Sequence, residues 1–411
     1  MIDEFEENLP PKIMAIKRIE IKNFKSFSDQ KIELGQFNIL VGANASGKSN
    51  FLKIFKFISD IANYGLNNAI SRQGGVKYLR NTSIATQENL ALKIVIDSNY
   101  SDNGLIEPEA TNIPEMTYEF ALNFKQPGLD FKVVADKFTY KPQNETGEFT
   151  LTRQGEFVTT ENTLGDLIPA FFRYSPLNKS LKPQTLLLEQ PLFRGIVAEL
   201  NQIDIFNHIP VYNFEVEQPK KASLIESQLD LEEDTRNLAI VLQNILADKE
   251  KKRRFLNMLT YVLPFVEEVR VEPFTEKYLV IILREAYSTV DLPMAFLSQG
   301  TINIISLVTI LYFQEKPLLL IEEPEKHTYP YLISKMMDML KEVSKRKQVI
   351  ITTHESETVK YANLENIFFI SRNQEGFSVI SNLADKPEVK IFLQSDEIGI
   401  EDLYLDNLLG I

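Results

Sequence analysis

The chain has 411 residues, of which 44% are hydrophobic and 25% charged, a composition typical of a globular protein with one large domain or two to three modules. A net charge of −13 disfavours a dedicated nucleic-acid-binding protein, the absence of cysteine excludes disulfides and cysteine zinc sites, and no apolar run reaches the ~18 residues that a membrane span needs. The acidic start of the chain does not resemble a signal peptide, so these features together predict a cytoplasmic location.

The first half of the chain is predicted to be rich in strands. After a mobile tail over residues 1–12, alternating apolar and polar residues predict strands at 13–21, 31–34, 37–41, 90–96, 117–124 and 131–140. The strands at 31–34 and 37–41 are expected to extend one sheet, and helical spacing follows at 50–58. We interpret residues 98–230 as an insertion with strands first and helices later.

The second half alternates between helices and strands. Helical patterns cover residues 234–263, 302–313 and 331–343, and strand patterns cover 266–271, 278–283, 318–321 and 348–353. Together with the phosphate-loop motif described next, this alternation predicts an α/β fold with a mostly parallel sheet. In such folds the ligand lies at the carboxyl ends of the strands.

A phosphate-binding motif connects the predicted strand at 37–41 to the helix that follows it. Residues 42–49 read Gly-Ala-Asn-Ala-Ser-Gly-Lys-Ser and fit G-x-x-x-x-G-K-[ST]. The two glycines allow a tight turn whose N–H groups face phosphate, and the helix N-terminus adds partial positive charge. Lys48 is expected to reach the β- and γ-phosphates of ATP, and the Ser49 hydroxyl to bind Mg²⁺. The predicted nucleotide-binding residues of this loop are Gly42, Ala43, Asn44, Ala45, Ser46, Gly47, Lys48, Ser49 and Asn50.

A pair of carboxylates follows the apolar strand at 318–321. A carboxylate at the tip of a buried strand can hold Mg²⁺ or its waters, and the next one can polarise an attacking water. We therefore assign Glu322 to the metal and Glu323 to the catalytic base. The simpler alternative is a pair of exposed acids that open a helix.

Two more motifs complete the predicted site. Leu-Ser-Gln-Gly at 297–300 precedes the helix at 302–313, where the Ser298 hydroxyl and the Gly300 amide would form an anion site. The simpler alternative is an ordinary serine N-cap. His354 directly follows the strand at 348–353 and is predicted to belong to the same site.

These motifs, in this order, resemble those of the ABC-type ATPases. The resemblance implies that the Ser298 motif binds the γ-phosphate held by the opposite subunit and that His354 contacts the γ-phosphate. The segment Ile-Lys-Asn-Phe-Lys-Ser at 21–26 resembles the first strand of the SMC, RecF and OLD-type branch, which implies that Lys25 and Ser26 lie near the nucleotide. Compact bacterial ATPases of this branch, several of them in anti-phage defence systems beside an effector nuclease, are the nearest resemblance.

The resemblance also implies an architecture. We expect an ABC-type ATPase head with a mostly parallel sheet, an antiparallel β subdomain and a helical signature lobe. The expected parts of the single head at 13–411 are a phosphate-loop half at 13–97, an inserted α+β subdomain at 98–230, a helical lobe at 231–316 and a half at 317–411 that carries Glu323 and His354. The sequence departs from the family pattern at Glu322, where aspartate is usual, and at Tyr329, where histidine is common. The family's Q-loop glutamine has three candidates, Gln184, Gln190 and Gln202.

Three functions remain open. The first is an ATP- and Mg²⁺-dependent switch that dimerises around two ATP molecules and serves DNA repair or anti-phage defence, with a nuclease or effector partner and with DNA as a further candidate. The second is the nucleotide-binding subunit of a membrane transporter, which the SMC-like first strand disfavours. The third is a scaffold that binds ATP with little turnover, which Glu323 disfavours. A separate nuclease site at Asp230, Glu232, Glu233 and Asp234 is less favoured than an acidic turn.

Overall fold

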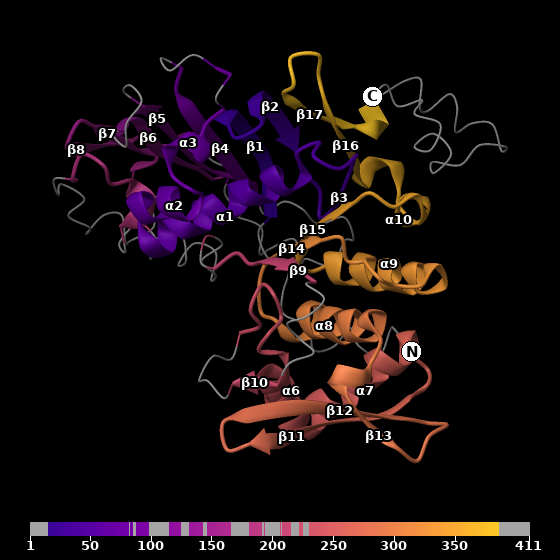
Figure 1. The fold of residues 1–411 in the computed structure, drawn as a ribbon. Coiled ribbons are helices and arrows are strands. Elements are labelled where there is room, and N and C mark those ends of the chain that lie inside the picture. The colour runs from indigo at the N-terminus through magenta and orange to yellow at the C-terminus, as the bar shows by residue number, and fades with distance from the viewer. Residues whose placement is uncertain are drawn as a thin grey trace.

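The computed structural model describes most of the chain as three sheets with helices between and below them (Figure 1). The described residues are 15–81, 83–84, 88–97, 115–124, 131–142, 146–165, 181–190, 193, 206, 208–214, 222–224 and 230–385. The predicted tail at 1–12, much of the predicted helical part of the insertion and the C-terminal segment after residue 385 lie outside these residues.

A seven-stranded antiparallel sheet forms one side of the molecule. Its order is β2 (Phe27–Glu33), β1 (Ala15–Phe24), β4 (Leu90–Asp97), β5 (Glu115–Phe124), β6 (Phe131–Lys141), β7 (Phe149–Gln154) and β8 (Phe157–Asn162). The expected antiparallel subdomain is therefore confirmed. The expectation that residues 31–34 extend the sheet of the phosphate loop is wrong, because β2 pairs with β1 through contacts such as Ile19 with Ile32.

A six-stranded sheet carries the predicted nucleotide motifs. Its order is β17 (Ser378–Asn382), β16 (Ile367–Arg372), β3 (Phe37–Val41), β15 (Gln348–Thr353), β14 (Leu318–Glu322) and β9 (Val211–Asn213). All pairs are parallel except β16 with β17, which confirms the predicted mostly parallel sheet. The carboxyl ends of β3, β15, β14 and β9 therefore lie at one edge of the sheet.

The strand β14, which lies next to the edge strand β9, contributes to two hydrophobic cores because successive side chains of a strand point to opposite faces. Leu318 and Leu320 belong to a core shared with the antiparallel sheet and α1 (Lys48–Tyr64), together with the short helices α2 (Leu66–Arg72), α3 (Val76–Leu79) and η3 (Leu187–Glu189). Leu319 and Ile321 belong to a second core on the other face of the sheet.

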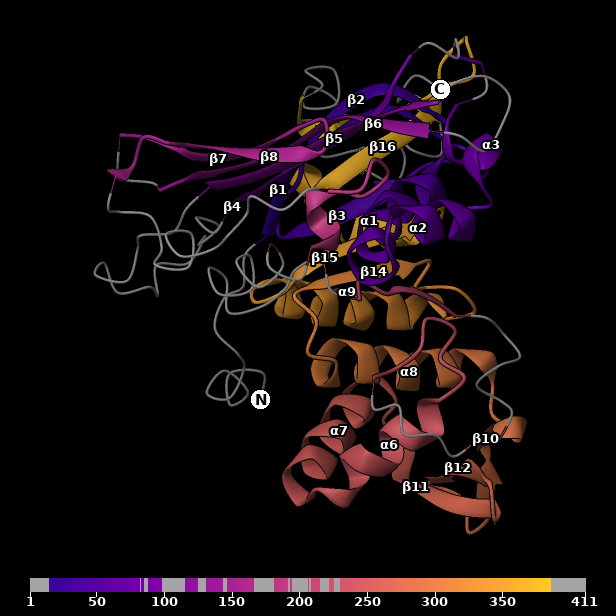
Figure 2. The same cartoon turned by 90° about the vertical axis from the view of Figure 1, so that its left-hand side faces the viewer.

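The second core lies in the helical lobe, which Figure 2 shows as successive layers under the parallel sheet. The helices of the lobe are α6 (Leu238–Ala247), α7 (Lys249–Val262), α8 (Gln299–Phe313) and α9 (Pro330–Ser344), and its small sheet contains β10 (Ser223–Leu224), β11 (Val266–Thr275), β12 (Tyr278–Glu285) and β13 (Asp291–Pro293). The remaining short elements are η4 (Met294–Phe296), α10 (Ser356–Lys360), η5 (Leu364–Asn366) and η6 (Leu383–Asp385). None of the described helices is long and apolar enough to cross a membrane.

Candidate nucleotide-binding site

The phosphate loop connects the end of β3 to the start of α1 through a turn that requires glycine. Ala45 has a φ of 63° and Gly47 a φ of 123°, so the backbone takes a conformation that side chains disfavour. A Cβ atom on Gly47 would lie 2.2 Å from the Ser378 hydroxyl oxygen. The β16–β17 hairpin thus fills the space that a larger residue would need.

Lys48 is held inside this loop. Its Nζ donates hydrogen bonds to the carbonyl oxygens of Gly42 at 2.6 Å and Ala43 at 3.1 Å, and the residue is only 7% exposed. Burial lowers the pKa of Lys48, while nearby carboxylates, led by Glu323, act in the opposite direction. The loop therefore places a buried cation between its own carbonyls and the acids at and just beyond the end of β14.

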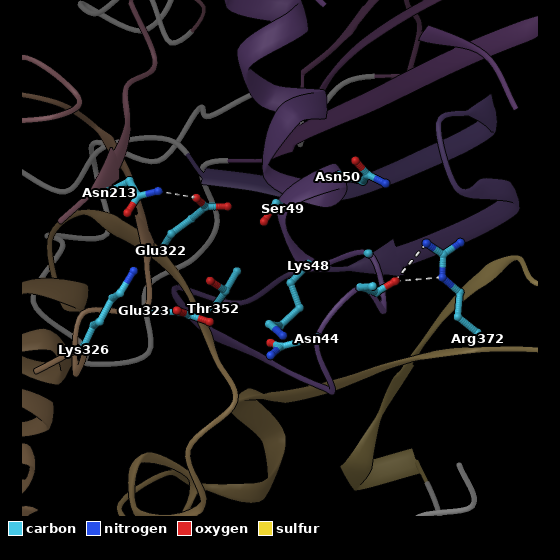
Figure 3. Close-up of a pocket in the computed structure, with 12 residues that line it drawn as sticks. Asn44, Lys48, Ser49, Asn50, Asn213, Glu322, Glu323, Lys326, Thr352 and Arg372 are labelled. Carbon is cyan, nitrogen blue, oxygen red and sulfur yellow. Dashed lines mark hydrogen bonds between the residues drawn. The ribbon is translucent and has the colours of Figure 1, made fainter. Parts of the chain in front are cut away.

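A cavity of about 480 Å³ brings the loop and the strand ends together (Figure 3). Its lining residues are Asn44, Ala45, Gly47, Lys48, Ser49, Asn50, Asn213, Glu322, Glu323, Lys326, Thr352 and Arg372. The loop motif, Glu322 at the end of β14 and Glu323 directly after it thus face one space, as expected from the shared edge of their parallel strands.

The two acids have different partners. Glu322 accepts a hydrogen bond at 3.2 Å from the side-chain amide of Asn213, at the end of β9. Glu323 has a φ of 45°, uncommon for a residue with a side chain, and its Oε1 lies 2.6 Å from Nδ1 of His354. The backbone turn after β14 thereby pairs the predicted base with the predicted histidine.

A third acid of this segment is buried behind the first two. Glu325 is 3% exposed and accepts a hydrogen bond from the Thr353 hydroxyl, so it joins the loop after β14 to the end of β15. Burial raises the pKa of Glu325 to about 7. This residue supports the site without lining the cavity.

The predicted anion site at the start of α8 faces solvent. The Ser298 hydroxyl caps α8 by accepting a hydrogen bond from the Thr301 amide at 3.1 Å, and Ser298 is exposed. A Cβ atom on Gly300 would lie 2.6 Å from the His327 carbonyl oxygen, so this turn packs directly on the segment after β14. Neither Ser298 nor Gly300 lines the cavity of its own chain, and their role toward a nucleotide stays a prediction.

The structure places Ser26 behind the loop and Lys25 beside α3, and neither residue lines the cavity. The Ser26 hydroxyl accepts hydrogen bonds from the Asn50 amide at 2.9 Å and the Ser378 hydroxyl at 2.8 Å. Lys25 donates to the Tyr78 carbonyl at 3.1 Å, and burial lowers its pKa to about 8. Ser26 therefore supports the loop indirectly.

Two lining residues come from strands that the sequence pattern did not predict. Asn213 ends β9, which has three residues, and Arg372 ends β16 and donates from Nε and Nη2 to the Ala45 carbonyl oxygen at 3.0 and 2.9 Å. Lys326 could have been found from its position directly after the Glu-Glu-Pro-Glu segment.

Two of the three glutamine candidates, Gln184 and Gln190, belong to the described part of the chain, and neither lines the cavity. Gln184 donates to the Phe131 carbonyl at 3.4 Å. Gln202 lies outside the described residues. Among the described residues, the side-chain amide that bonds to Glu322 is that of Asn213.

Comparison with known proteins identifies the family. A family model described as AAA ATPase domain matches residues 14–359, most of the chain, so the protein belongs to this ATPase family. No curated protein matches the chain.

Two solved structures show the fold. One is an Smc head bound to the C-winged helix domain of ScpA, with 17% identity, a TM-score of 0.51 and coverage of 92% of this chain and 99% of that chain. The other is an Smc head with an extended coiled coil bound to the C-terminal domain of ScpA, from Pyrococcus furiosus, with 14% identity, a TM-score of 0.52 and coverage of 93% and 100%. The chain thus has the fold of an SMC head.

Proposed function

We propose that this chain binds ATP and Mg²⁺ in the cavity between the phosphate loop and the end of β14, and that it hydrolyses the ATP. One observation carries the proposal: Lys48 and Ser49 of the loop line the same cavity as Glu322 and Glu323. A loop of this kind binds phosphate, and carboxylates opposite it are typical of phosphoryl-transfer sites.

The residues of the cavity fit a magnesium nucleotide. Ammonium and guanidinium groups of Lys48, Lys326 and Arg372 suit phosphate oxygens, and the oxygens of Ser49 and Glu322 are the hard ligands that Mg²⁺ prefers. Bound Mg²⁺ would polarise the phosphate oxygens and neutralise their charge.

Glu323 is the group that we propose accepts the proton of the attacking water. It lines the cavity, and its contact with Nδ1 of His354 fixes the orientation of both side chains. This intact pair favours an ATPase with turnover over a scaffold that only binds ATP.

We further propose that two copies associate around two ATP molecules, with Ser298 and Gly300 of one copy serving the nucleotide of the other. The exposure of Ser298 and its position outside its own cavity support this arrangement. The assembly would act in the cytoplasm as a switch in DNA repair or anti-phage defence, with an effector or nuclease and with DNA as a candidate ligand. That the compared Smc heads carry a domain of ScpA supports a protein partner.

The test is a comparison of ATP binding and ATP cleavage in wild type and Glu323→Gln. Loss of a positioned base costs about 10²–10⁴-fold in rate, so the variant should bind ATP normally and cleave it that much more slowly. Glu322→Gln serves as the matched control. Its affinity for Mg²⁺ should be weaker, so that cleavage requires a higher Mg²⁺ concentration. Normal cleavage by Glu323→Gln would contradict the assigned base, and no Mg²⁺-dependent cleavage by the wild type would favour the scaffold.

A further inference from the structure

Lys326 is a cation of the nucleotide cavity that comes from the turn after β14. It follows the proposed base by three residues, and its backbone amide donates a hydrogen bond to the Glu323 carbonyl oxygen at 3.0 Å. In Figure 3 Lys326 lies on the side of Glu322 and Glu323, whereas Lys48 and Arg372 lie on the other side. The proposed base and this ammonium group therefore belong to one turn.

The ammonium group of Lys326 is available to a ligand. The residue is exposed and lines the cavity, and its ammonium group makes no hydrogen bond or ion pair with the described part of the chain. Lys48 differs, because its Nζ donates to two carbonyl oxygens of the loop. Lys326 thus keeps its three donors for oxygen atoms that enter the cavity.

A buried amide of α8 holds the backbone at this position. Nδ2 of Asn303 donates to the Lys326 carbonyl oxygen at 2.7 Å, and Oδ1 of Asn303 accepts from Nε2 of Gln299 at 3.0 Å. Asn303 is 1% exposed and lies between the buried residues Ile302 and Ile304. An amide in such surroundings destabilises the fold unless its hydrogen bonds are made, so the bond to Lys326 accounts for a polar residue in this apolar helix.

We propose that Lys326 is a catalytic residue of the proposed hydrolysis, and that Asn303 is the positioning residue that sets its place. This inference rests on the proposed function. In the reaction, a water oxygen forms a bond to the γ-phosphorus of ATP, and Glu323 takes a proton of that water. The bond from the γ-phosphorus to the bridging oxygen breaks, and ADP leaves with the electron pair.

The position of Lys326 favours the transition state over bound ATP. Lys48 and the loop hold the phosphates from one side, and the water attacks from the side of Glu323. The transferred phosphoryl group therefore moves toward Lys326 as it leaves ADP, so that the ammonium group stabilises the charge on its oxygens more strongly as the bond breaks. Lys326 should thus raise kcat while contributing little to ATP affinity.

The test is the ATPase kinetics of Lys326→Gln in the full chain. Its kcat should fall by about 10²- to 10³-fold, the effect of removing one donor to a transition-state oxyanion, while its ATP affinity stays unchanged. Lys326→Arg, which keeps the charge, should recover most of the rate. Lys249→Gln, which removes a charge from the exposed start of α7, should match the wild type.

A double-mutant cycle tests the role of Asn303. Asn303→Leu should lower kcat by about 10- to 10²-fold without changing ATP affinity, because a displacement of about 1 Å at a catalytic group has an effect of this size. If Asn303 acts through Lys326, the double variant Asn303→Leu/Lys326→Gln should be no slower than Lys326→Gln alone. Thr309→Val is the matched control and should leave kcat unchanged, since the buried Thr309 hydroxyl donates to the Ile305 carbonyl oxygen within the same helix.

A measurement without turnover uses ADP with aluminium fluoride, which mimics the phosphoryl group during transfer. The wild type should bind this pair more tightly than ADP alone, and Lys326→Gln should lose most of that gain. A wild-type kcat or an undiminished gain in Lys326→Gln would overturn the role of Lys326. An unchanged kcat in Asn303→Leu, or full additivity in the double variant, would overturn the positioning role. A wild type that cleaves no ATP and gains nothing from aluminium fluoride would reject the proposed hydrolysis, and this role with it.

Discussion

At the scale of single residues, the phosphate loop depends on side chains from outside the loop. The hydroxyl oxygens of Ser26 and Ser378 lie 2.8 Å apart behind Gly47, and the Ser378 hydroxyl oxygen lies 2.5 Å from the Ser46 carbonyl oxygen. Arg372 holds the Ala45 carbonyl from the exposed side. The unusual backbone angles of the loop are therefore fixed from both sides before a nucleotide binds, which lowers the ordering cost of binding.

Lys48→Ala should weaken ATP binding by about 10- to 100-fold, because hydrogen bonds to charged groups contribute about 1.5–3 kcal/mol. Titration with a fluorescent ATP analogue measures the affinity. Lys249→Ala is the control for loss of a lysine elsewhere. Unchanged affinity in Lys48→Ala, with an unchanged unfolding curve, would contradict the assignment of the loop.

Arg372→Gln should weaken ATP binding by about tenfold, because it removes the charged clamp on the Ala45 carbonyl and one cation of the cavity. The same titration, combined with the double variant Lys48→Ala/Arg372→Gln, separates the two roles. If Arg372 acts only by fixing the loop, its effect should persist when ADP replaces ATP. Affinities equal to wild type for both nucleotides would show that the clamp has no function in binding.

At the scale of elements, a buried acid links the antiparallel sheet to the segment after it. Asp136 on β6 is 1% exposed and accepts hydrogen bonds from the Tyr118 hydroxyl at 2.9 Å and from the Leu187 amide of η3 at 2.8 Å. Burial raises the pKa of Asp136 to about 7. The folded state therefore binds this proton more tightly than the unfolded state.

It follows that the contribution of Asp136 to stability is complete at low pH and is lost as the pH rises through about 7. Between the ordinary aspartate pKa of 3.8 and the folded-state pKa of about 7, the free energy of unfolding should fall with a slope approaching about 1.4 kcal/mol per pH unit. Asp136→Asn should have a flatter pH profile than the wild type in urea unfolding between pH 5 and pH 8. Parallel profiles for the two proteins would show that Asp136 is ionised across this range.

The elements differ in how well the sequence predicts them. The segment β3–loop–α1 was predictable because its motif and periodicity are local, and β14 and β15 were predictable as continuous apolar runs. The three-residue strand β9 has no such pattern, and its strand state comes from pairing with β14, more than a hundred residues away in the sequence. The prediction assigned β2 to the wrong sheet for a related reason, since the pairing of a strand is a tertiary property. Accordingly the loop and Glu322, Glu323 and His354 were predicted, and Asn213 and Arg372 were not.

At the scale of the whole molecule, the proposed shared site can be tested by mixing subunits. Ser298→Arg should leave ATP binding to one copy intact and should block ATP-dependent association, since the larger side chain would occupy the place of the phosphate. Mixed with Lys48→Ala, it should restore part of the ATPase activity, because one of the two composite sites then carries neither substitution. Association by Ser298→Arg in ATP, measured by light scattering, would instead indicate a site completed within one chain.

The position of β14 between two cores has a mechanical consequence. Leu318 and Leu320 are fixed to the antiparallel sheet and α1, while Leu319 and Ile321 are fixed to the helical lobe. Interiors of this density transmit small displacements with little loss. Any rotation of one half against the other must therefore strain the strand whose end carries Glu322 and Glu323. A partner that bends the two halves against each other would therefore change the reactivity of these acids. By reciprocity, nucleotide binding would oppose the same bending with an equal free energy.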